Sequence, residues 1–306
     1  MDGLFYWLLN MSILGTLTGA VILLLRTIKR IQRRWIVILW GIPLLRFWLP
    51  VSIGGKYSLM SLLSGLTTKT VVVYQSPGRE TVYTAVNSVQ AASSYFPITY
   101  RSNVLEDVFR WAALVWAVGA AALILALGIL YVSTLSELRD AERLRDKVYV
   151  SPKVTAPAVY GILRPRIILP ASAAASEDLE LIVLHEGRHI RRGDNLWRML
   201  AFFTAAIHWF NPAVWLFLKL FLSDAEIACD ESVLSRLPAD DRKRYAHALL
   251  NARTGKTVFA SAFGGAKVRT RVERILSYRK MTLASVCAFA LLAAAIAYFL
   301  LANGAP

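Results

Sequence analysis

Two histidines and a glutamate stand at the spacing of a helix-borne zinc site. His185 and His189 are four residues apart, and Glu186 directly follows the first histidine. In a helix, residues four apart lie on one face, so both imidazoles can bind one metal ion with the glutamate beside its open position. This pattern indicates metal-assisted hydrolysis in which the glutamate acts as the general base. A charged helix with two exposed histidines has the same spacing, so the pattern needs support from the rest of the chain.

A third ligand is expected because catalytic zinc takes three protein ligands and leaves the fourth position for water. Glu226 and Asp230 are four residues apart and would share one helix face. We predict that Glu226 is the third ligand and that Asp230 accepts a hydrogen bond from a zinc-bound histidine. Two alternatives remain. A capping box beginning at Ser223 would explain Glu226, and Cys229 is a competing ligand, although it points to a different face and is typical of a small buried side chain.

Several further polar residues have weaker patterns. Asp194 follows the expected end of the histidine helix, and either supports a histidine or caps the next helix. His208 is typical of a packed histidine beside Trp209 rather than a ligand. Tyr245 and His247 lie in a charged stretch and are expected mainly on a solvated face, with an oxyanion donor as the alternative. The basic run at 269–280 is expected to contact lipid headgroups.

The composition is that of a membrane protein. The 306 residues are 56% hydrophobic, with a mean hydropathy of +0.48, whereas soluble domains are about 45–50% apolar. Residues 4–25, 111–135 and 281–302 are apolar stretches long enough to cross a bilayer. Residues 35–53 are a fourth candidate span, interrupted by charge and proline. The first stretch lacks a preceding basic region and a cleavage pattern, so we predict an anchor and not a signal peptide.

The distribution of charge predicts the topology. The net charge is +15, and basic residues crowd the connection 26–34 and the segment 136–280, whereas 54–107 carries few charges. Because basic loops stay in the cytoplasm, we place both basic segments inside, and the amino terminus, 54–107 and 303–306 outside. The basic surplus is then a topology signal, and we expect no direct contact with nucleic acid. The two cysteines lie in a reducing and a lipid environment, and are not expected to form a disulfide.

The chain therefore divides by position relative to the membrane. Residues 1–53 are predicted to hold transmembrane helices 1 and 2, 54–107 an extracellular loop, 108–135 helix 3, 136–280 a cytoplasmic domain, 281–302 helix 4, and 303–306 an extracellular tail. The lipid bilayer is thus one expected partner, and the oligomeric state stays open, with a homodimer as one alternative.

Three local patterns organise the segment 136–280. The runs 158–162 and 166–169 are β-prone and separated by a turn, which predicts a hairpin. The histidine helix is expected to end at Arg191-Arg192-Gly193. The apolar stretch 196–222 is interrupted by Asn211-Pro212, which predicts two short helices folded back on each other. This re-entrant or membrane-apposed hairpin would return the chain to the cytoplasmic face, where Glu226 can meet His185.

These segments, taken in order, resemble the BlaR/MecR antirepressor family of integral-membrane zinc metallopeptidases. The resemblance is carried by residues 151–161, 164–170, 184–195, 207–212, 226–231, 260–265 and 269–275. It implies a mainly α membrane protein with four transmembrane helices and a cytoplasmic α+β, gluzincin-like domain that uses Zn²⁺. It also implies signal transduction linked to antibiotic resistance, by cleavage of a cytoplasmic repressor of the BlaI/MecI type. Family members cut themselves before the last span, which would correspond here to Ser261, Ala262 and Phe263.

The resemblance has one departure and leaves two other functions open. Members that sense antibiotics carry a large extracellular penicillin-binding domain after the fourth span, and the present sequence ends at Pro306. The resemblance therefore implies either a sensorless relative or a piece of a longer protein, and extends to proteolysis but not to sensing. A non-catalytic transducer that keeps the zinc fold is disfavoured by Glu186. A housekeeping protease of the CAAX-processing or heat-shock type is disfavoured by the hairpin ending in Tyr160-Gly161 and by residues 208–212.

Overall fold

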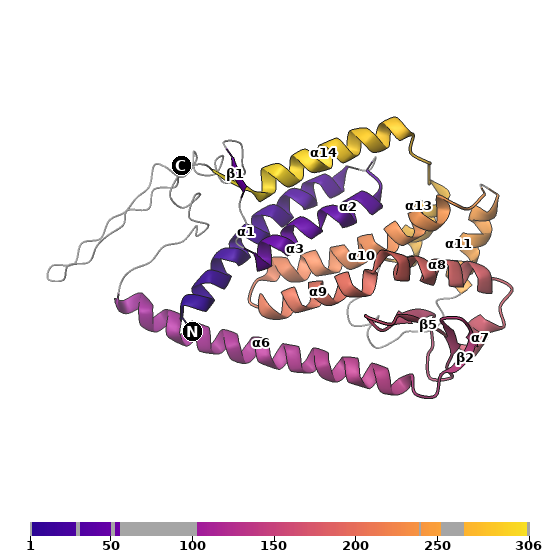
Figure 1. Cartoon of the computed structure of the whole chain (residues 1–306), viewed down its shortest axis with the longest axis horizontal. Coiled ribbons are helices and arrows are strands. Elements are labelled where there is room, and N and C mark those ends of the chain that lie inside the picture. The colour runs from indigo at the N-terminus through magenta and orange to yellow at the C-terminus, as the bar shows by residue number, and fades with distance from the viewer. Residues whose placement is uncertain are drawn as a thin grey trace.

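The structure is a computed structural model that describes residues 2–28, 31–49, 53–55, 103–238, 240–251 and 266–304. It is mainly helical, with two small sheets (Figure 1). The helices are α1 (Asp2–Thr27), α2 (Arg33–Leu39), α3 (Gly41–Trp48), α6 (Asn103–Glu137), α7 (Ala171–Ala174), α8 (Leu179–Arg192), α9 (Asp194–Ile207), α10 (Pro212–Leu234), α11 (Asp241–Asn251), α13 (Val268–Leu276) and α14 (Leu283–Leu301). The strands are β1 (Ile53–Gly55), β2 (Glu142–Arg145), β3 (Val148–Val150), β4 (Ala158–Tyr160), β5 (Arg166–Leu169) and β6 (Ala302–Gly304).

Three of the described helices are long and apolar enough to cross a membrane. They comprise Trp7–Thr27 of α1, Arg110–Ser136 of α6 and Leu283–Leu301 of α14. The long apolar helices predicted at 4–25, 111–135 and 281–302 are therefore confirmed. In Figure 1, α14 and α1–α3 lie on one side of the pair α9 and α10, and α6 runs along the other side.

The fourth candidate span, at 35–53, is not one long helix in the structure. It is divided into α2, with 7 residues, and α3, with 8 residues, which meet at Trp40. Pro43 has no N–H group, so the carbonyl of Leu39 lacks its usual partner four residues later, which weakens the helix at this junction. The chain then leaves helical geometry at Leu49, and β1 pairs in parallel with β6. The ends of the second and last apolar stretches thus lie together.

The pair α9 and α10 forms the folded-back hairpin predicted at 196–222. Asn211 is the N-cap of α10, its Oδ1 atom accepts the N–H of Ala213 at 2.9 Å, and Pro212 occupies the first turn. The Nδ2 group of Asn211 also donates to the hydroxyls of Ser12 and Thr16 in α1, at 2.8 and 2.7 Å. The break predicted at Asn211-Pro212 is confirmed, and the same asparagine fixes the turn against the first long helix.

The larger sheet supports α8. Its strand order is β2-β3-β5-β4, and β4 and β5 pair antiparallel, which confirms the predicted hairpin. Gly161 ends β4 with φ +87°, and a Cβ atom there would lie 2.9 Å from the carbonyl oxygen of Arg164, so the turn requires glycine. Buried side chains of the sheet, among them Val148, Ile167 and Leu169, form a core with Ile182 of α8. This core fixes the position of the helix that carries the two histidines.

The two ends of α8 are well defined. Ser176 lies in the turn before the helix, where its hydroxyl accepts the N–H of Asp178, and the helix itself begins at Leu179. It ends, as predicted, where Gly193 adopts the left-handed conformation with φ +65°. The chain therefore turns directly from α8 into α9, with Asp194 as the first residue of the next helix.

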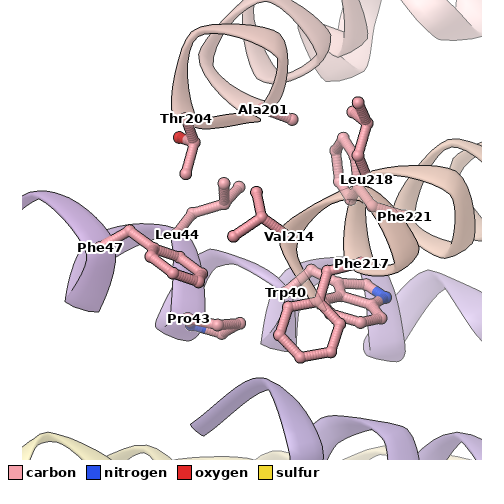
Figure 2. A pocket seen from close by; sticks show the side chains of 10 residues that line it. All are labelled: Trp40, Pro43, Leu44, Phe47, Ala201, Thr204, Val214, Phe217, Leu218 and Phe221. Atoms are coloured by element: carbon pink, nitrogen blue, oxygen red, sulfur yellow. The ribbon is translucent and has the colours of Figure 1, made fainter. Parts of the chain in front are cut away.

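A small apolar cavity lies where α3 meets the hairpin (Figure 2). Its polar lining group, the hydroxyl of Thr204, donates to the carbonyl of Leu200 and accepts the indole N–H of Trp48. The cavity is therefore a feature of apolar helix packing. It is lined by Trp40, Pro43, Leu44, Phe47, Ala201, Thr204, Val214, Phe217, Leu218 and Phe221.

Candidate metal centre

Helices α8 and α10 bring the predicted site residues together. His185, Glu186 and His189 are buried on α8, and Asp230 is buried on α10. The Nε2 atoms of the two histidines are 3.3 Å apart, and Oε1 of Glu226 lies 3.8 Å from Nε2 of His189. The hairpin thus carries an acidic side chain to the imidazole of His189.

These distances fit a tetrahedral metal site. Zinc ligands bonded at about 2.0–2.1 Å to a tetrahedral ion lie roughly 3.3–3.5 Å from one another. The two Nε2 atoms have this spacing, whereas the Glu226 oxygen is 3.8 Å from Nε2 of His189 and would have to move closer to share the same ion. The capping-box explanation of Glu226 is excluded, since α10 runs without interruption from Pro212 to Leu234 and no helix begins at Ser223.

Cys229 is the other side chain near the histidines. His185, His189 and Cys229 offer ligand atoms that lie within 4.8 Å of one another. However, the sulfur is 3.6 Å from Nδ1 of His185 and 3.4 Å from its backbone carbonyl oxygen, and so lies on the ring edge away from Nε2. Burial raises the pKa of the thiol, while its contact with His189 acts in the opposite direction. Among the described residues, Cys229 completes a group of three possible ligands with both histidines, whereas the contact of Glu226 is with His189.

Asp194 supports His189 from behind. Its Oδ2 atom lies 2.6 Å from Nδ1 of His189, so the imidazole donates this proton and presents Nε2 to the centre of the site. The alternative role, a side-chain cap of α9, is not realised. Burial alone would lower the pKa of His189, but Cys229, Asp194 and Glu226 raise it well above its usual value.

His185 is held by Tyr245 rather than directly by Asp230. The Tyr245 hydroxyl lies 2.8 Å from Nδ1 of His185 and donates to Oδ1 of Asp230 at 2.7 Å, whereas Asp230 itself is 3.4 Å from that nitrogen. The expected direct bond from histidine to Asp230 is thus replaced by a relay through a phenol. Tyr245 is 2% exposed, so the preferred solvated placement was wrong, while His247 is exposed as expected. Tyr245 faces inward because it shares the apolar face of α11 with Leu249.

Arg271 was missed as a site residue. It is 2% exposed, and its Nε and Nη2 groups donate to the two oxygens of Asp230, each at 2.7 Å. Nη1 lies 3.1 Å from Oε2 of Glu226, and Nη2 lies 3.3 Å from Nε2 of His185. The expected basic flank at 269–280 therefore points one arginine inward, on the face of α13 that also buries Ile275. Arg274 has the same spacing to Tyr278 as Arg271 has to Ile275, so the sequence alone does not single out Arg271.

The charges of the two arginines keep Glu226 ionised. Arg198 of α9 donates to Oε1 of Glu226 at 2.7 Å, opposite Arg271. Burial alone would raise the pKa of Glu226, but Arg271, His189 and Arg198 hold it well below its usual value. Burial, followed by the charges of Arg271 and His189, lowers the pKa of His185, so this imidazole is neutral.

Glu186 has the environment of a proton acceptor. Its carboxylate is buried, and within the described part of the chain it forms no hydrogen bond or ion pair. Burial raises its pKa above the ordinary value of a glutamate, which brings it closer to neutral pH. A buried carboxylate without a hydrogen-bond partner among the described residues can take up and release a proton without first breaking a bond.

The remaining predicted residues lie apart from this centre. His208 is buried in the hairpin turn, where its Nε2 atom lies 3.2 Å from the carbonyl of Phe47 and its ring packs on the Phe47 ring, as predicted for a packed histidine. Ser261, Ala262 and Phe263, the predicted self-cleavage region, lie outside the described residues.

Comparison with known proteins now identifies the family. The family model described as "BlaR1 peptidase M56" matches residues 6–276. The chain belongs to the BlaR1 peptidase M56 family. It is 28% identical over 152 residues to the regulatory protein BlaR1 of Bacillus licheniformis, covering 46% of this chain and 25% of that protein. It is 30% identical over 103 residues to the methicillin resistance mecR1 proteins of Staphylococcus aureus and Staphylococcus epidermidis, covering 33% of this chain and 18% of each relative.

Membership of the M56 family agrees with the site and the helices. A metallopeptidase family implies a bound metal ion, and the buried imidazole pair has the spacing to hold one. The three long apolar helices and the family relationship indicate a membrane protein. The chain spans a quarter or less of the length of these curated relatives.

Proposed function

We propose that this chain is a membrane-embedded zinc endopeptidase that cleaves a cytoplasmic protein in a signal-transduction pathway. The single observation that carries the proposal is that Nε2 of His189 lies 3.3 Å from Nε2 of His185 and 3.8 Å from Oε1 of Glu226, on the helix that also buries Glu186. His185, His189 and Glu226 would hold the metal, with Asp194 and Asp230 in supporting positions. A structural metal site has no need of an unpaired base, so Glu186 favours an enzyme over a non-catalytic transducer.

The chain's own residues supply proton transfer and orientation. A zinc ion bound here would act as a Lewis acid toward a water molecule and the scissile carbonyl group. Glu186 accepts a proton from the attacking water and returns it to the leaving amine nitrogen, so its carboxylate is regenerated. Asp194 and Tyr245 hold the Nδ1 edges of the imidazoles, which keeps both Nε2 atoms directed into the site.

We propose that α1, α6, α14 and the pair α2 and α3 cross the bilayer. Many exposed side chains of α6 are large and apolar, among them Val115, Val118, Leu125, Ile129 and Val132, which is the surface expected toward lipid. The amino and carboxyl termini are then outside, and residues 136–280 form the cytoplasmic protease domain.

The hairpin turn is well suited to lie at membrane depth. Backbone that is not helical needs partners within the protein there, because lipid offers none. The indole of Trp116, in the candidate span of α6, donates to the carbonyl of Ile207 at 2.7 Å. The indole of Trp209 donates back to the carbonyl of Trp116 at 3.2 Å. These bonds support a re-entrant hairpin between α1 and α6.

The proposed substrate is a transcriptional repressor of the BlaI/MecI type. This follows from likeness to proteins named BlaR1 and mecR1, and would link the chain to antibiotic resistance. Self-cleavage near Ser261, Ala262 and Phe263 belongs to the same proposal. A housekeeping protease of the CAAX-processing or heat-shock type is the alternative, and would act on other membrane or misfolded proteins instead.

Replacement of the proposed base tests the enzyme directly. We expect Glu186→Gln to lower the rate of cleavage by about 10²–10⁴-fold, because the proton acceptor is lost while the metal ligands remain. The measurement is cleavage of the BlaI/MecI-type repressor from the same genome by the detergent-purified chain, with bound zinc measured by elemental analysis. Glu180→Gln is the matched control, since Glu180 is exposed on the same helix and pairs with Arg145.

Two outcomes would overturn the assignment. One is purified protein that binds no metal, and the other is repressor cleavage that continues at the same rate in Glu186→Gln. Cleavage of casein, with the repressor untouched, would instead favour the housekeeping alternative.

A further inference from the structure

Arg271 occupies the middle of the candidate metal centre. Its side chain is nearly inaccessible to solvent, and its guanidinium group contacts Asp230, Glu226 and His185 at distances between 2.7 and 3.3 Å. Two of these three residues are proposed metal ligands. The guanidinium group therefore lies between atoms that a metal ion would have to bind.

The contact with His185 excludes metal at the same nitrogen. The arginine side chain has only donor groups, so Nη2 must donate to Nε2 of His185. Nε2 is then the acceptor, with a free lone pair and no proton. The proton of the neutral imidazole then lies on Nδ1, facing the Tyr245 oxygen. An imidazole nitrogen has one lone pair, which cannot accept a hydrogen bond and bind a metal ion at the same time.

The contact with Glu226 adds a second competition of a weaker kind. Each carboxylate oxygen has two lone pairs, so Glu226 can bind a metal through Oε1 while Oε2 keeps its bond to Nη1. Oε1, however, already accepts the Nη2 group of Arg198 at 2.7 Å. Two positive charges thus stand within hydrogen-bond distance of the one carboxylate that a divalent cation needs.

The pair with Asp230 anchors the arginine independently of the metal. Both bonds of this pair are 2.7 Å long, shorter than the contacts with Glu226 and His185. Asp230 is itself buried and is oriented by the Tyr245 hydroxyl. A small turn of the guanidinium about this anchor releases His185 without removing the arginine from the site.

We propose that Arg271 is an internal competitor of the metal ion, so that its guanidinium group lowers the metal affinity of the site. In the arrangement described here, the guanidinium offsets the charge of the buried carboxylates and occupies the lone pair of His185. Metal binding requires Nη2 to leave His185 while the pair with Asp230 persists. This inference rests on the proposed function, because it takes His185 and Glu226 as the ligands.

The test is a zinc titration of the full chain in detergent after removal of metal with a chelator. Zinc affinity is measured by competition with a zinc-binding fluorescent dye. We expect Arg271→Gln to bind zinc about ten- to a hundredfold more tightly than the unsubstituted chain, since a charge-assisted contact no longer competes. A residue needed only for folding would give the opposite result, because a damaged site binds metal more weakly.

Two further variants make the test decisive. Arg269→Gln is the matched control, because Arg269 lies on the same helix with its side chain 90% exposed, and its zinc affinity should not change. Arg271→Lys keeps the buried positive charge for Asp230 but loses the planar fork, so it should bind zinc more tightly by a smaller factor. Arg271→Lys decides the question if Arg271→Gln does not fold.

The outcomes separate this inference from the proposed function. Zinc binding in the unsubstituted chain that both Arg271 variants leave unchanged or weaken would overturn the inference alone. A chain that binds no zinc, with or without Arg271, would overturn both.

Discussion

At the scale of single residues, the orientation of the imidazoles depends on groups remote from them in sequence. Asp194 is five positions from His189, but Tyr245 is 60 positions from His185, and Arg271 is 86 positions away. Each Nδ1 atom lies within 2.8 Å of an oxygen atom, which opposes rotation of the rings and keeps their Nε2 atoms directed into the site. The geometry of the centre is therefore set by three elements besides α8.

Removal of the Tyr245 hydroxyl tests this arrangement. Tyr245→Phe keeps the buried ring but breaks the relay from His185 to Asp230. We expect zinc affinity to fall by about 10- to 100-fold, because loss of such a supporting bond leaves the histidine free to rotate. The dye competition assay measures the change. Tyr278→Phe is the control, since Tyr278 is buried in the same cluster of α10, α11 and α13 and contacts none of the site histidines. An equal loss in both variants would contradict the relay.

The sequence predicted the site residues that are close to one another along the chain. It missed those that only folding brings together. His185, Glu186 and His189 were identified because helical spacing alone brings them together. Asp230 was expected to bond a histidine directly, but the phenol of Tyr245 stands between them. Arg271 was assigned to a basic flank, because the neighbouring residues do not indicate which arginine of the run at 269–280 is buried.

At the scale of elements, α10 has two acidic faces with different tasks. Glu226 and Asp230 face the metal centre, while Asp224 and Glu231 lie on the opposite side of the helix. Asp224 is fully buried, its two oxygens share the single Nε–H group of Arg26, and it accepts the indole N–H of Trp40. One helix thus connects the site to the first two membrane segments.

Glu231 fixes the start of α2 in a similar way. Its two carboxylate oxygens accept the backbone N–H groups of Arg33 and Arg34, each at 3.0 Å. These N–H groups have no partner within the helix, and a carboxylate at a helix N-terminus is favoured by the helix dipole. The basic connection after α1 is therefore held by the same helix that carries Glu226.

Two glycines of α6 provide a test of how the hairpin packs. A Cβ atom at Gly119 would lie 2.6 Å from the ring of Trp209, whereas at Gly128 nothing lies within 4 Å. Replacement of either glycine by alanine raises helix propensity by about 1 kcal/mol, so the difference between them isolates the clash. We expect Gly119→Ala to lower the melting temperature in detergent, and Gly128→Ala to keep or raise it. Equal melting temperatures would contradict the close packing of α6 on the hairpin turn.

Elements were predicted where local chemistry determines them. Asn211-Pro212 marks a helix break because proline fits only the first turn and asparagine caps it. The interruption at Trp40 was not predicted as a division of 35–53 into two helices, although proline was recognised as an interruption of this stretch. Its position depends on tertiary contacts, since Trp40 is buried by a bond to Asp224 and by packing on Phe217.

At the scale of the whole molecule, the basic connection and the metal centre lie at the same end. Asp224 binds Arg26, and the side chain of Gln32 donates to the carbonyl of Arg279 just before α14. In Figure 1 the sheet, α8, α11 and α13 gather at this end, and the amino terminus, β1 and β6 lie toward the other. This arrangement agrees with the distribution of charge in the sequence, in which 26–34 and 136–280 are the basic segments.

Labelling of single cysteines tests the topology that follows. Because short basic connections stay in the cytoplasm, the end that holds residues 26–28 and 31–34 should face inward, together with the protease domain.

Leu163 is 94% exposed in the turn between β4 and β5, and Leu4 is 53% exposed at the start of α1. In a Cys287→Ala background, we expect an impermeant maleimide added to intact cells to label Leu4→Cys but not Leu163→Cys. Permeabilised cells should show both labelled, which controls for accessibility. Native Cys229 stays in place, because it is fully buried. Labelling of Leu163→Cys in intact cells would put the metal centre outside, where a cytoplasmic repressor cannot reach it.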